Sequence, residues 1–308
     1  MEFSDVQTGF GRVVANKADF FIVEFEDIKS TQACQASQSL PVSAPFRFLC
    51  KCRSRLIHKG EFVFVGDYVS IDDIDWRSFR AVISDIHPRK SLFIRPPVAN
   101  AEQIIVALSF DQPSFDIDQA TRFLISAEQS NLDIIFLLTK RDLLETDDVQ
   151  KQLQRFNLWG YDPIAISTKT GQGIDDLYLH LKKAKITLIC GPSGVGKSSL
   201  LKRLMPNMSI LIGDLSRRLK RGKNTTRHVE LYSLQEGLYI ADTPGFNRPD
   251  IQVKPKHLAF YFPELRNQLI DYPCKFRDCL HMDELGCAID KNFERYSIYN
   301  RFLQELMH

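Results

Sequence analysis

The segment that most constrains the fold of this 308-residue chain is GPSGVGKS, at residues 191–198. It fits the pattern G-x-x-x-x-G-K-[ST], in which glycines let a loop surround phosphate oxygens with backbone N–H groups. An apolar run at 185–190 predicts a strand before the loop, and residues 198–204 predict a helix whose N-terminus favours bound anions. A strand, a phosphate loop and a helix in this order predict an α/β nucleotide-binding domain.

This loop supplies most of the expected contacts to phosphate and magnesium. Lys197 would reach the β and γ phosphates and act in catalysis, and Ser198 would ligate Mg²⁺. The nucleotide-contacting residues expected here are Gly191, Pro192, Ser193, Gly194, Val195, Gly196, Lys197, Ser198 and Ser199.

A second motif, Asp242-Thr243-Pro244-Gly245, follows the apolar run 238–241. In the D-x-x-G pattern, the aspartate holds the Mg²⁺ shell and the glycine N–H senses the γ-phosphate. Alone this pattern usually marks a turn, but its place at a strand end downstream of a phosphate loop favours a switch. We therefore expect Asp242 to contact the nucleotide and its metal, and Gly245 to act in catalysis.

The motif Thr139-Lys140-Arg141-Asp142 lies at the end of a predicted strand, 133–138, where ligands bind in open α/β sheets. Asp142 can accept hydrogen bonds from guanine N1 and its exocyclic amine, a pattern that adenine lacks, so the motif favours GTP. Lys140 would pack along the base, and Thr139 keeps a hydroxyl where Asn is more common. A charged turn after a strand is the alternative, and the other motifs favour the base-reading interpretation.

The loop 167–171, which begins at Ser167, would close over the guanine with a backbone N–H. The motifs then occur in the order base motif, closing loop, phosphate loop and switch, whereas a phosphate loop usually opens such a domain. This order predicts a circularly permuted nucleotide domain. Permutation is physically tolerable because chain termini at a surface can be rejoined elsewhere.

Residues 1–97 read as short strands without a long helical pattern, at 11–14, 20–25, 46–50, 62–65, 68–71 and 80–83. Such spacing predicts a small β-barrel of the OB type, and another small barrel or a sandwich is the alternative. The polar stretch 30–43 is expected to be a long exposed loop. Residues 91–97 are expected to be a linker, because Pro96 and Pro97 stop both helix and ladder.

Residues 98–250 alternate between apolar strands and helices. Continuous apolar strands separated by helices predict a parallel sheet covered on both faces. The expected strands are 103–108, 133–138, 163–166, 185–190 and 238–241, and the expected helices are about 118–130, 147–158, 175–183 and 198–204.

Residues 251–308 are expected to form a helical zinc-binding domain. Cys274, Cys279, His281 and Cys287 supply three thiolates and one imidazole, the ligand set of a closed structural Zn²⁺ site. A full set of protein ligands leaves no open position, so the role is stability rather than catalysis. The flanking segments 255–269 and 292–307 look helical and too short to hold a core by themselves.

The remaining cysteines favour packing over chemistry. Cys50 and Cys52 would point to one face of a strand, where a metal site is the less favoured interpretation. Cys34 and Cys190 read as isolated small hydrophobes. The net charge of +2 places any nucleic-acid affinity in local patches, and no apolar run approaches a membrane span. The N-terminus lacks a signal core, so we expect a soluble protein of an interior compartment.

Taken together, these motifs resemble the RsgA (YjeQ) family of circularly permuted GTPases, which mature the small ribosomal subunit. The resemblance covers the whole chain and rests on GPSGVGKSSL, on DTPGF and on the spacing C-x₄-C-x-H-x₅-C. It implies an OB barrel, a permuted GTPase core and a C-terminal zinc domain. It also implies GTP or GDP with Mg²⁺ as ligands, together with one structural Zn²⁺.

Residues 222–231 resemble the family's first switch, with Asn224 where the family pattern has His. Thr225, rather than Thr226, is expected to complete the Mg²⁺ shell and serve catalysis, although the residues leave both open. Phe246 stands where Ras-type GTPases place a water-orienting glutamine. Intrinsic hydrolysis should therefore be slow, and the resemblance implies activation by the small ribosomal subunit.

The favoured function is an RNA-associated GTPase whose nucleotide state controls binding to the immature small subunit and release from it. The basic run 217–223 favours rRNA contact because it lies beside the switch. A regulatory scaffold with incidental hydrolysis is the rival, and a kinase is disfavoured because Asp142 selects guanine. We expect a monomer without a membrane partner, in the cytoplasm or, if the N-terminus was trimmed, in an organelle.

Overall fold

The computed structural model describes residues 6–17, 20–25, 46–94, 96–206, 229–235, 237–242 and 251–307. The chain divides into two compact units, of which the first comprises residues 1–102, 184–188 and 207–246 and the second comprises the rest. The expected loop 30–43 and Cys34 lie outside the described residues. No helix in the described ranges has the length and apolar character needed to cross a membrane.

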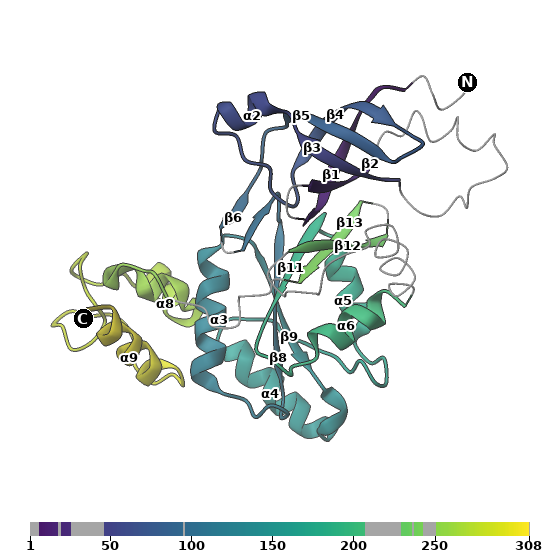
Figure 1. Ribbon diagram of the computed structural model, residues 1–308. Coiled ribbons are helices and arrows are strands. Elements are labelled where there is room, and N and C mark those ends of the chain that lie inside the picture. The colour runs from purple at the N-terminus through teal and green to yellow at the C-terminus, as the bar shows by residue number, and fades with distance from the viewer. Residues whose placement is uncertain are drawn as a thin grey trace. The chain divides into compact units, whose positions relative to one another are not determined.

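Five strands of the first unit form a closed barrel (Figure 1), which confirms the predicted OB-type fold. The strands are β1 (Thr8–Lys17), β2 (Phe20–Phe25), β3 (Arg47–Cys52), β4 (Tyr68–Asp75) and β5 (Arg80–Ile86). Closure comes from β1, which pairs with both β2 and β4, while β3 runs parallel to β5. A short helix, α2 (Ser54–His58), lies between β3 and β4.

The two cysteines of β3 contact the same hydrophobic core of the barrel, which confirms the prediction that both side chains lie on one face of a strand. Cys50 is fully buried with Val13, Val23 and Phe48, and Cys52 packs against the same cluster. Burial raises the pKa of the Cys50 thiol to about 12. At neutral pH this thiol therefore stays protonated, which suits a small hydrophobe better than a metal ligand.

Two expectations for the N-terminal region were wrong. Residues 62–65 do not form a strand, because Asp67 accepts the Phe64 N–H at 2.7 Å and turns the chain there. The expected linker 91–97 instead holds most of a two-stranded hairpin, β6 (Leu92–Ile94) and β7 (Pro97–Ala99). Pro97 is the first residue of its strand, a position where a missing N–H is tolerated.

A second hairpin in the first unit, β12 (Glu230–Gln235) and β13 (Leu238–Asp242), joins the barrel. β12 pairs antiparallel with the barrel strand β1, with Ala15 opposite Glu230. The Tyr239 hydroxyl of β13 donates to the buried carboxylate of Glu24 at 2.9 Å. The strand that carries Asp242 is thus fastened to the barrel, and the sequence pattern did not predict β12.

The second unit contains three parallel strands, β8 (Gln103–Ser109), β9 (Asp133–Thr139) and β10 (Ile164–Ala165). Every residue of β8 is buried, as expected for a strand covered on both faces. Figure 1 shows α3 and α5 on opposite sides of these strands. The helices are α3 (Ile117–Gln129), α4 (Thr146–Leu158), α5 (Ile174–Leu181) and α6 (Lys197–Leu204).

The C-terminal part of this unit is helical, as predicted, with two corrections. The segment 255–269 is not one helix but a 3₁₀ helix, η3 (Pro255–Tyr261), followed by α8 (Pro263–Asp271). Phe262 is extended between them, because the ring of Pro263 disfavours a helical conformation in the preceding residue. The last helix, α9 (Tyr296–Met307), begins later than residue 292.

A buried arginine holds the C-terminal helices against the region that follows α4. Arg295 has no exposed surface, pairs with Glu264, and lies 4.4 Å from the ring centroid of Trp159. Glu294 beside it accepts hydrogen bonds from the Trp159 indole at 2.8 Å and from Arg155. Because the Arg295 and Glu264 charges are shielded from water, removing either of these two partners would leave the other buried and unpaired.

Candidate functional site

The phosphate loop follows β11 (Ile186–Cys190) and begins α6, as the sequence predicted. Gly191 has a φ of +141°, and a Cβ at this position would lie 2.1 Å from the Ala107 carbonyl oxygen. A side chain there would push the loop away from β8. Gly196, with a φ of +101°, is the N-cap residue of α6. It has no side chain to satisfy the first N–H groups of the helix, which leaves them available to an anion.

The amine of Lys197 lies within the loop. Its Nζ donates to the carbonyl oxygens of Gly191 at 2.5 Å and Pro192 at 2.8 Å. Ser198 and Ser199 are exposed on the first turn of α6. One basic group and two hydroxyls thus surround the start of the helix, an arrangement suited to a polyphosphate with a divalent cation.

Thr139 connects the base-reading strand to the phosphate loop. The side chain is buried, and its Oγ1 lies 3.1 Å from the Leu108 carbonyl oxygen and 2.5 Å from that of Val195. A hydroxyl carries one proton, so it shares that proton between two acceptors, whereas the more common asparagine amide could donate one to each. With threonine in place of asparagine, the strand stays hydrogen-bonded to the phosphate loop, but through one donated proton instead of two.

Asp142 is oriented by the loop that was expected to close over the guanine. The Ser167 hydroxyl donates to Asp142 Oδ1 at 2.5 Å and accepts the Thr170 N–H at 3.1 Å. The Arg141 N–H donates to the Ile166 carbonyl at 3.0 Å, which joins the two loops through the backbone as well. The hydrogen bond from Ser167 is the main cause that lowers the pKa of Asp142. The carboxylate is exposed and ionised at neutral pH, as a guanine acceptor requires.

Lys140 occupies a left-handed backbone conformation with a φ of +60°. Its Nζ donates to the Gln112 carbonyl oxygen, which also accepts the Ser109 hydroxyl proton at 3.0 Å. The loop after β8 therefore contacts the candidate nucleotide site, a position that sequence reasoning missed. No signal could have revealed it, because a backbone carbonyl acceptor does not depend on the identity of its residue.

The switch residues are only partly described. Asp242 ends β13 in the first unit. The predicted catalytic residues Thr225 and Gly245 lie outside the described residues, as do Asn224, Thr226, Phe246 and the basic run 217–223.

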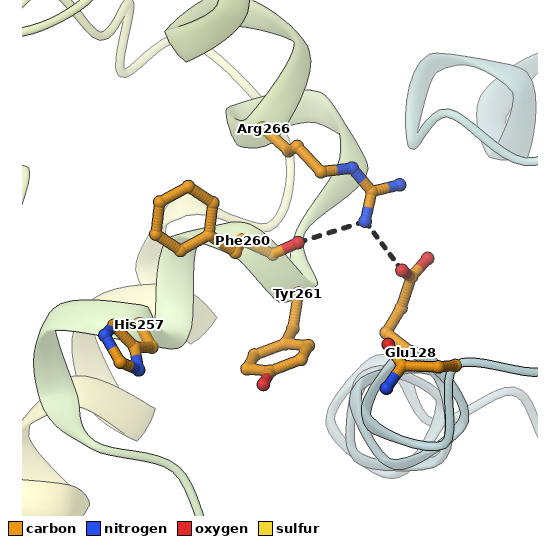
Figure 2. A pocket seen from close by; sticks show the side chains of 6 residues that line it. Glu128, His257, Phe260, Tyr261 and Arg266 are labelled. Atoms are coloured by element: carbon orange, nitrogen blue, oxygen red, sulfur yellow. Dashed lines mark hydrogen bonds and ion pairs between the residues drawn. The ribbon is translucent and has the colours of Figure 1, made fainter.

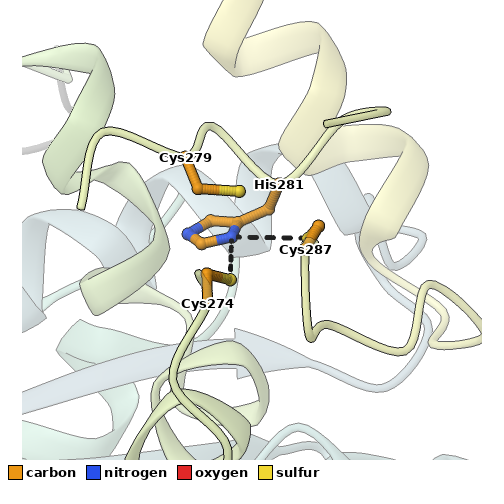
Figure 3. Close-up of side chains that lie close together, drawn as sticks. All are labelled: Cys274, Cys279, His281 and Cys287. Carbon is orange, nitrogen blue, oxygen red and sulfur yellow. Dashed lines mark hydrogen bonds between the residues drawn. The ribbon is translucent and has the colours of Figure 1, made fainter. Parts of the chain in front are cut away.

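The four predicted zinc ligands come together in the second unit (Figure 3). The ligand atoms of Cys274, Cys279, His281 and Cys287 all lie within 4.8 Å of one another. His281 Nδ1 is 3.5 Å from Cys274 Sγ and 3.8 Å from Cys287 Sγ. Bonds of about 2.3 Å to sulfur and about 2.0 Å to nitrogen in a tetrahedron place the ligand atoms roughly 3.5 to 3.8 Å apart. The two distances from His281 match this spacing and no pair of ligand atoms is more than 4.8 Å apart, so the cluster is compatible with a Zn²⁺ ion.

The loop around His281 is held by polar contacts beyond the cluster. Glu284 accepts the N–H groups of Leu280 at 2.8 Å and Met282 at 2.9 Å, and the Tyr296 hydroxyl donates to the His281 carbonyl at 2.9 Å. These bonds stabilise the left-handed backbone of His281, whose φ is +60°. Burial lowers the pKa of His281, which favours the neutral imidazole that binds metals.

Comparison with known proteins agrees with this geometry. The family model described as RsgA GTPase matches residues 86–252. The Small ribosomal subunit biogenesis GTPase RsgA of Prochlorococcus marinus (strain MIT 9303) is 50% identical over 296 residues, covering 96% of this chain and 92% of the relative. The protein of the same name from Synechococcus sp. (strain CC9311) is 47% identical, covering 96% of this chain and 94% of the relative.

Two solved structures are similar over nearly the whole chain. YjeQ from Thermotoga maritima is 29% identical with a TM-score of 0.76, covering 97% of this chain and 99% of that one. YloQ, described as a circularly permuted GTPase, is 28% identical with a TM-score of 0.74, covering 100% and 98%. These similarities confirm the predicted fold class and the permuted order of the motifs. The chain belongs to the RsgA GTPase family.

Proposed function

We propose that this protein hydrolyses GTP and uses the nucleotide state to control its binding to the immature small ribosomal subunit. The observation that carries the proposal is the connected base and phosphate site. Asp142 is oriented by Ser167, and Thr139 links the same motif to the phosphate loop at Val195. The names of the relatives support the subunit as the partner.

The metal ligands follow from the same site. Ser198, Asp242 and Thr225 would hold Mg²⁺ beside the β and γ phosphates, where the ion would neutralise developing negative charge. Cys274, Cys279, His281 and Cys287 would hold one Zn²⁺, which would cross-link the C-terminal helices. Lys197, Thr225 and Gly245 would contact the γ-phosphate during hydrolysis.

On the small subunit, the protein contacts rRNA. It acts as a monomer where ribosomes are assembled. That place is the cytoplasm of a bacterium, or an organelle of bacterial origin. The N-terminal barrel, residues 1–97, and the basic run 217–223 supply RNA contacts around a GTPase core at 98–250 and a zinc domain at 251–308. Residues 247–250 would transmit loss of the γ-phosphate from the switch to the zinc domain.

A regulatory scaffold with incidental hydrolysis is the second candidate, because Asn224 and Phe246 replace residues that would activate water. Single-turnover hydrolysis of GTP, measured with and without purified small subunits, separates the two functions. A rate raised by the subunit supports the GTPase switch. Unchanged slow hydrolysis together with tight subunit binding in the GTP form would support the scaffold.

A further inference from the structure

A pocket in the second unit belongs neither to the nucleotide site nor to the cysteine cluster (Figure 2). It has a volume of about 410 Å³, within the usual range for small-ligand sites. Its walls come from the C-terminal end of α3, from η3 and from α8. The lining residues are Glu128, Asn131, His257, Phe260, Tyr261 and Arg266.

The inside of the pocket is electrically balanced. Arg266 Nη1 donates to Glu128 Oε2 at 2.7 Å and to the Phe260 carbonyl oxygen at 3.0 Å. The Tyr161 hydroxyl donates to Glu128 Oε1 at 3.1 Å. A phosphate or an acidic side chain would compete with this carboxylate for Arg266, so the interior suits an uncharged group. A carboxylate has about four acceptor sites, so Glu128 can still accept an N–H from a ligand.

The rim of the pocket is aromatic, and the helix that forms it is basic. Phe260 is 51% exposed, and its ring centroid lies 6.3 Å from that of the exposed His257. Lys254 and Lys256, at the start of the same helix, are exposed and form no ion pair with any residue that the structure describes. Exposed rings beside unpaired lysines are the usual means of binding single-stranded nucleic acid, since bases stack on the rings and phosphates approach the charges.

We propose that this pocket binds one unpaired RNA base, stacked on Phe260 and flanked by His257, whose ring is inclined at 61° to that of Phe260, with the adjoining phosphates near Lys254 and Lys256. This inference rests on the proposed function, which makes RNA a partner. Glu128 favours a base whose edge carries an exocyclic amine, so adenine binds better than uracil. A peptide is the less suitable occupant, because an acidic side chain would meet Glu128 and an aliphatic one would offer no donor to the remaining acceptor sites of Glu128.

The test uses the full-length, zinc-loaded protein with fluorescently labelled oligo(A) and oligo(U), followed by anisotropy. Phe260→Ala should weaken oligo(A) binding about tenfold, as expected for one lost stacking contact. Phe276→Ala is the matched control, because Phe276 is also 51% exposed but lies on the loop between Cys274 and Cys279, outside the residues that line the pocket. Glu128→Gln should keep binding but reduce the preference for oligo(A), since the amide keeps one acceptor for Arg266 and loses the others. Zinc content and circular dichroism establish that each variant is folded.

The outcomes separate the pocket from the proposed function. The proposed RNA-binding role of the pocket would be overturned if Phe260→Ala and Phe276→Ala lost equal oligo(A) affinity, or if Phe260→Ala lost none. A failure of the parent protein to bind oligo(A) would overturn it as well. If the parent's GTP hydrolysis is nevertheless raised by small subunits, the proposed function stands without the pocket. If subunits have no effect but Phe260→Ala alone loses oligo(A), the RNA pocket stands and the proposed function fails. Cross-linking from a photoreactive residue at position 260 identifies the occupant directly. Capture of ribosomal protein alone would show that the pocket binds a peptide and not RNA.

Discussion

The nucleotide site and the cysteine–histidine cluster differ in how far apart along the chain their parts lie. All four cluster residues fall between 274 and 287, on one loop. In the nucleotide site, Thr139 contacts Val195 across 56 residues, and Lys140 contacts Gln112 across 28. The cluster therefore depends mainly on its ligand and its own loop, whereas the nucleotide site depends on the sheet that brings distant loops together. Loss of a cluster residue should therefore affect the C-terminal helices alone, whereas loss of a contact in the nucleotide site should affect several loops of the sheet.

The largest effect is expected at the cluster. Cys279→Ser should abolish zinc binding and unfold η3, α8 and α9, because structural zinc contributes about 10 kcal/mol or more to the folding of small domains. The parent should carry about one zinc per chain, by the four-ligand rule. Elemental analysis and far-ultraviolet circular dichroism measure both quantities. The control, Cys52→Ser, alters a half-buried cysteine of the barrel and should leave the zinc content unchanged. A Cys279→Ser protein with full helicity and an intact C-terminal region would contradict the structural role.

The next largest effect concerns guanine recognition. Asp142→Asn removes a charged acceptor pair and should weaken GTP binding by roughly 10- to 100-fold, the equivalent of about 1.5–3 kcal/mol for hydrogen bonds to a charged group. Xanthosine triphosphate binding should improve, because xanthine presents an acceptor where guanine has its amine. Competition among GTP, ATP and xanthosine triphosphate measures the change. Asp162→Asn, at an exposed aspartate outside the motif, is the control. An unchanged preference for GTP in Asp142→Asn would remove this residue from the base site.

The separation of contacting residues along the chain also explains which parts of the two sites could be predicted from the sequence. The phosphate loop and the cluster could be recognised because each is a local pattern of residue types with fixed spacing. The acceptors of Thr139 and Lys140 could not, because they are carbonyl oxygens of Val195 and Gln112, which any residue supplies. The hairpin β6–β7 was missed because Pro97 was read as a break, although a strand can begin at proline. The pocket beside η3 depends on packing between segments more than 100 residues apart, such as Glu128 and Arg266, separated by 138.

A smaller effect tests whether the nucleotide site is one connected unit. Thr139→Val keeps the shape of the side chain but removes its proton, which leaves the carbonyl oxygens of Leu108 and Val195 without that donor. The cost should be about 1–3 kcal/mol, divided between stability and GTP affinity. Thr139→Ser should restore most of the loss, because it returns the hydroxyl. Thermal unfolding and GTP titration of both variants measure the two parts. If Thr139→Val loses stability but binds GTP as tightly as the parent, the hydrogen bond to Val195 does not contribute to phosphate binding.

The smallest effect is a shift in the pH dependence of base recognition. The Ser167 hydrogen bond lowers the folded-state pKa of Asp142 below its usual value of 3.8, so the carboxylate contributes to GTP binding above that lowered pKa and loses its contribution as the pH falls through it. Ser167→Ala removes the donor, so the pKa should rise toward the usual value and GTP binding should fail at a higher pH than in the parent. The carbon chemical shift of the Asp142 carboxyl, assigned with Asp142→Asn, follows the titration directly in both proteins. The cluster serves as the internal comparison, because Ser167 does not contact it and the zinc content at neutral pH should be equal in parent and variant. Identical titration midpoints would mean that the closing loop positions Asp142 without stabilising its charge.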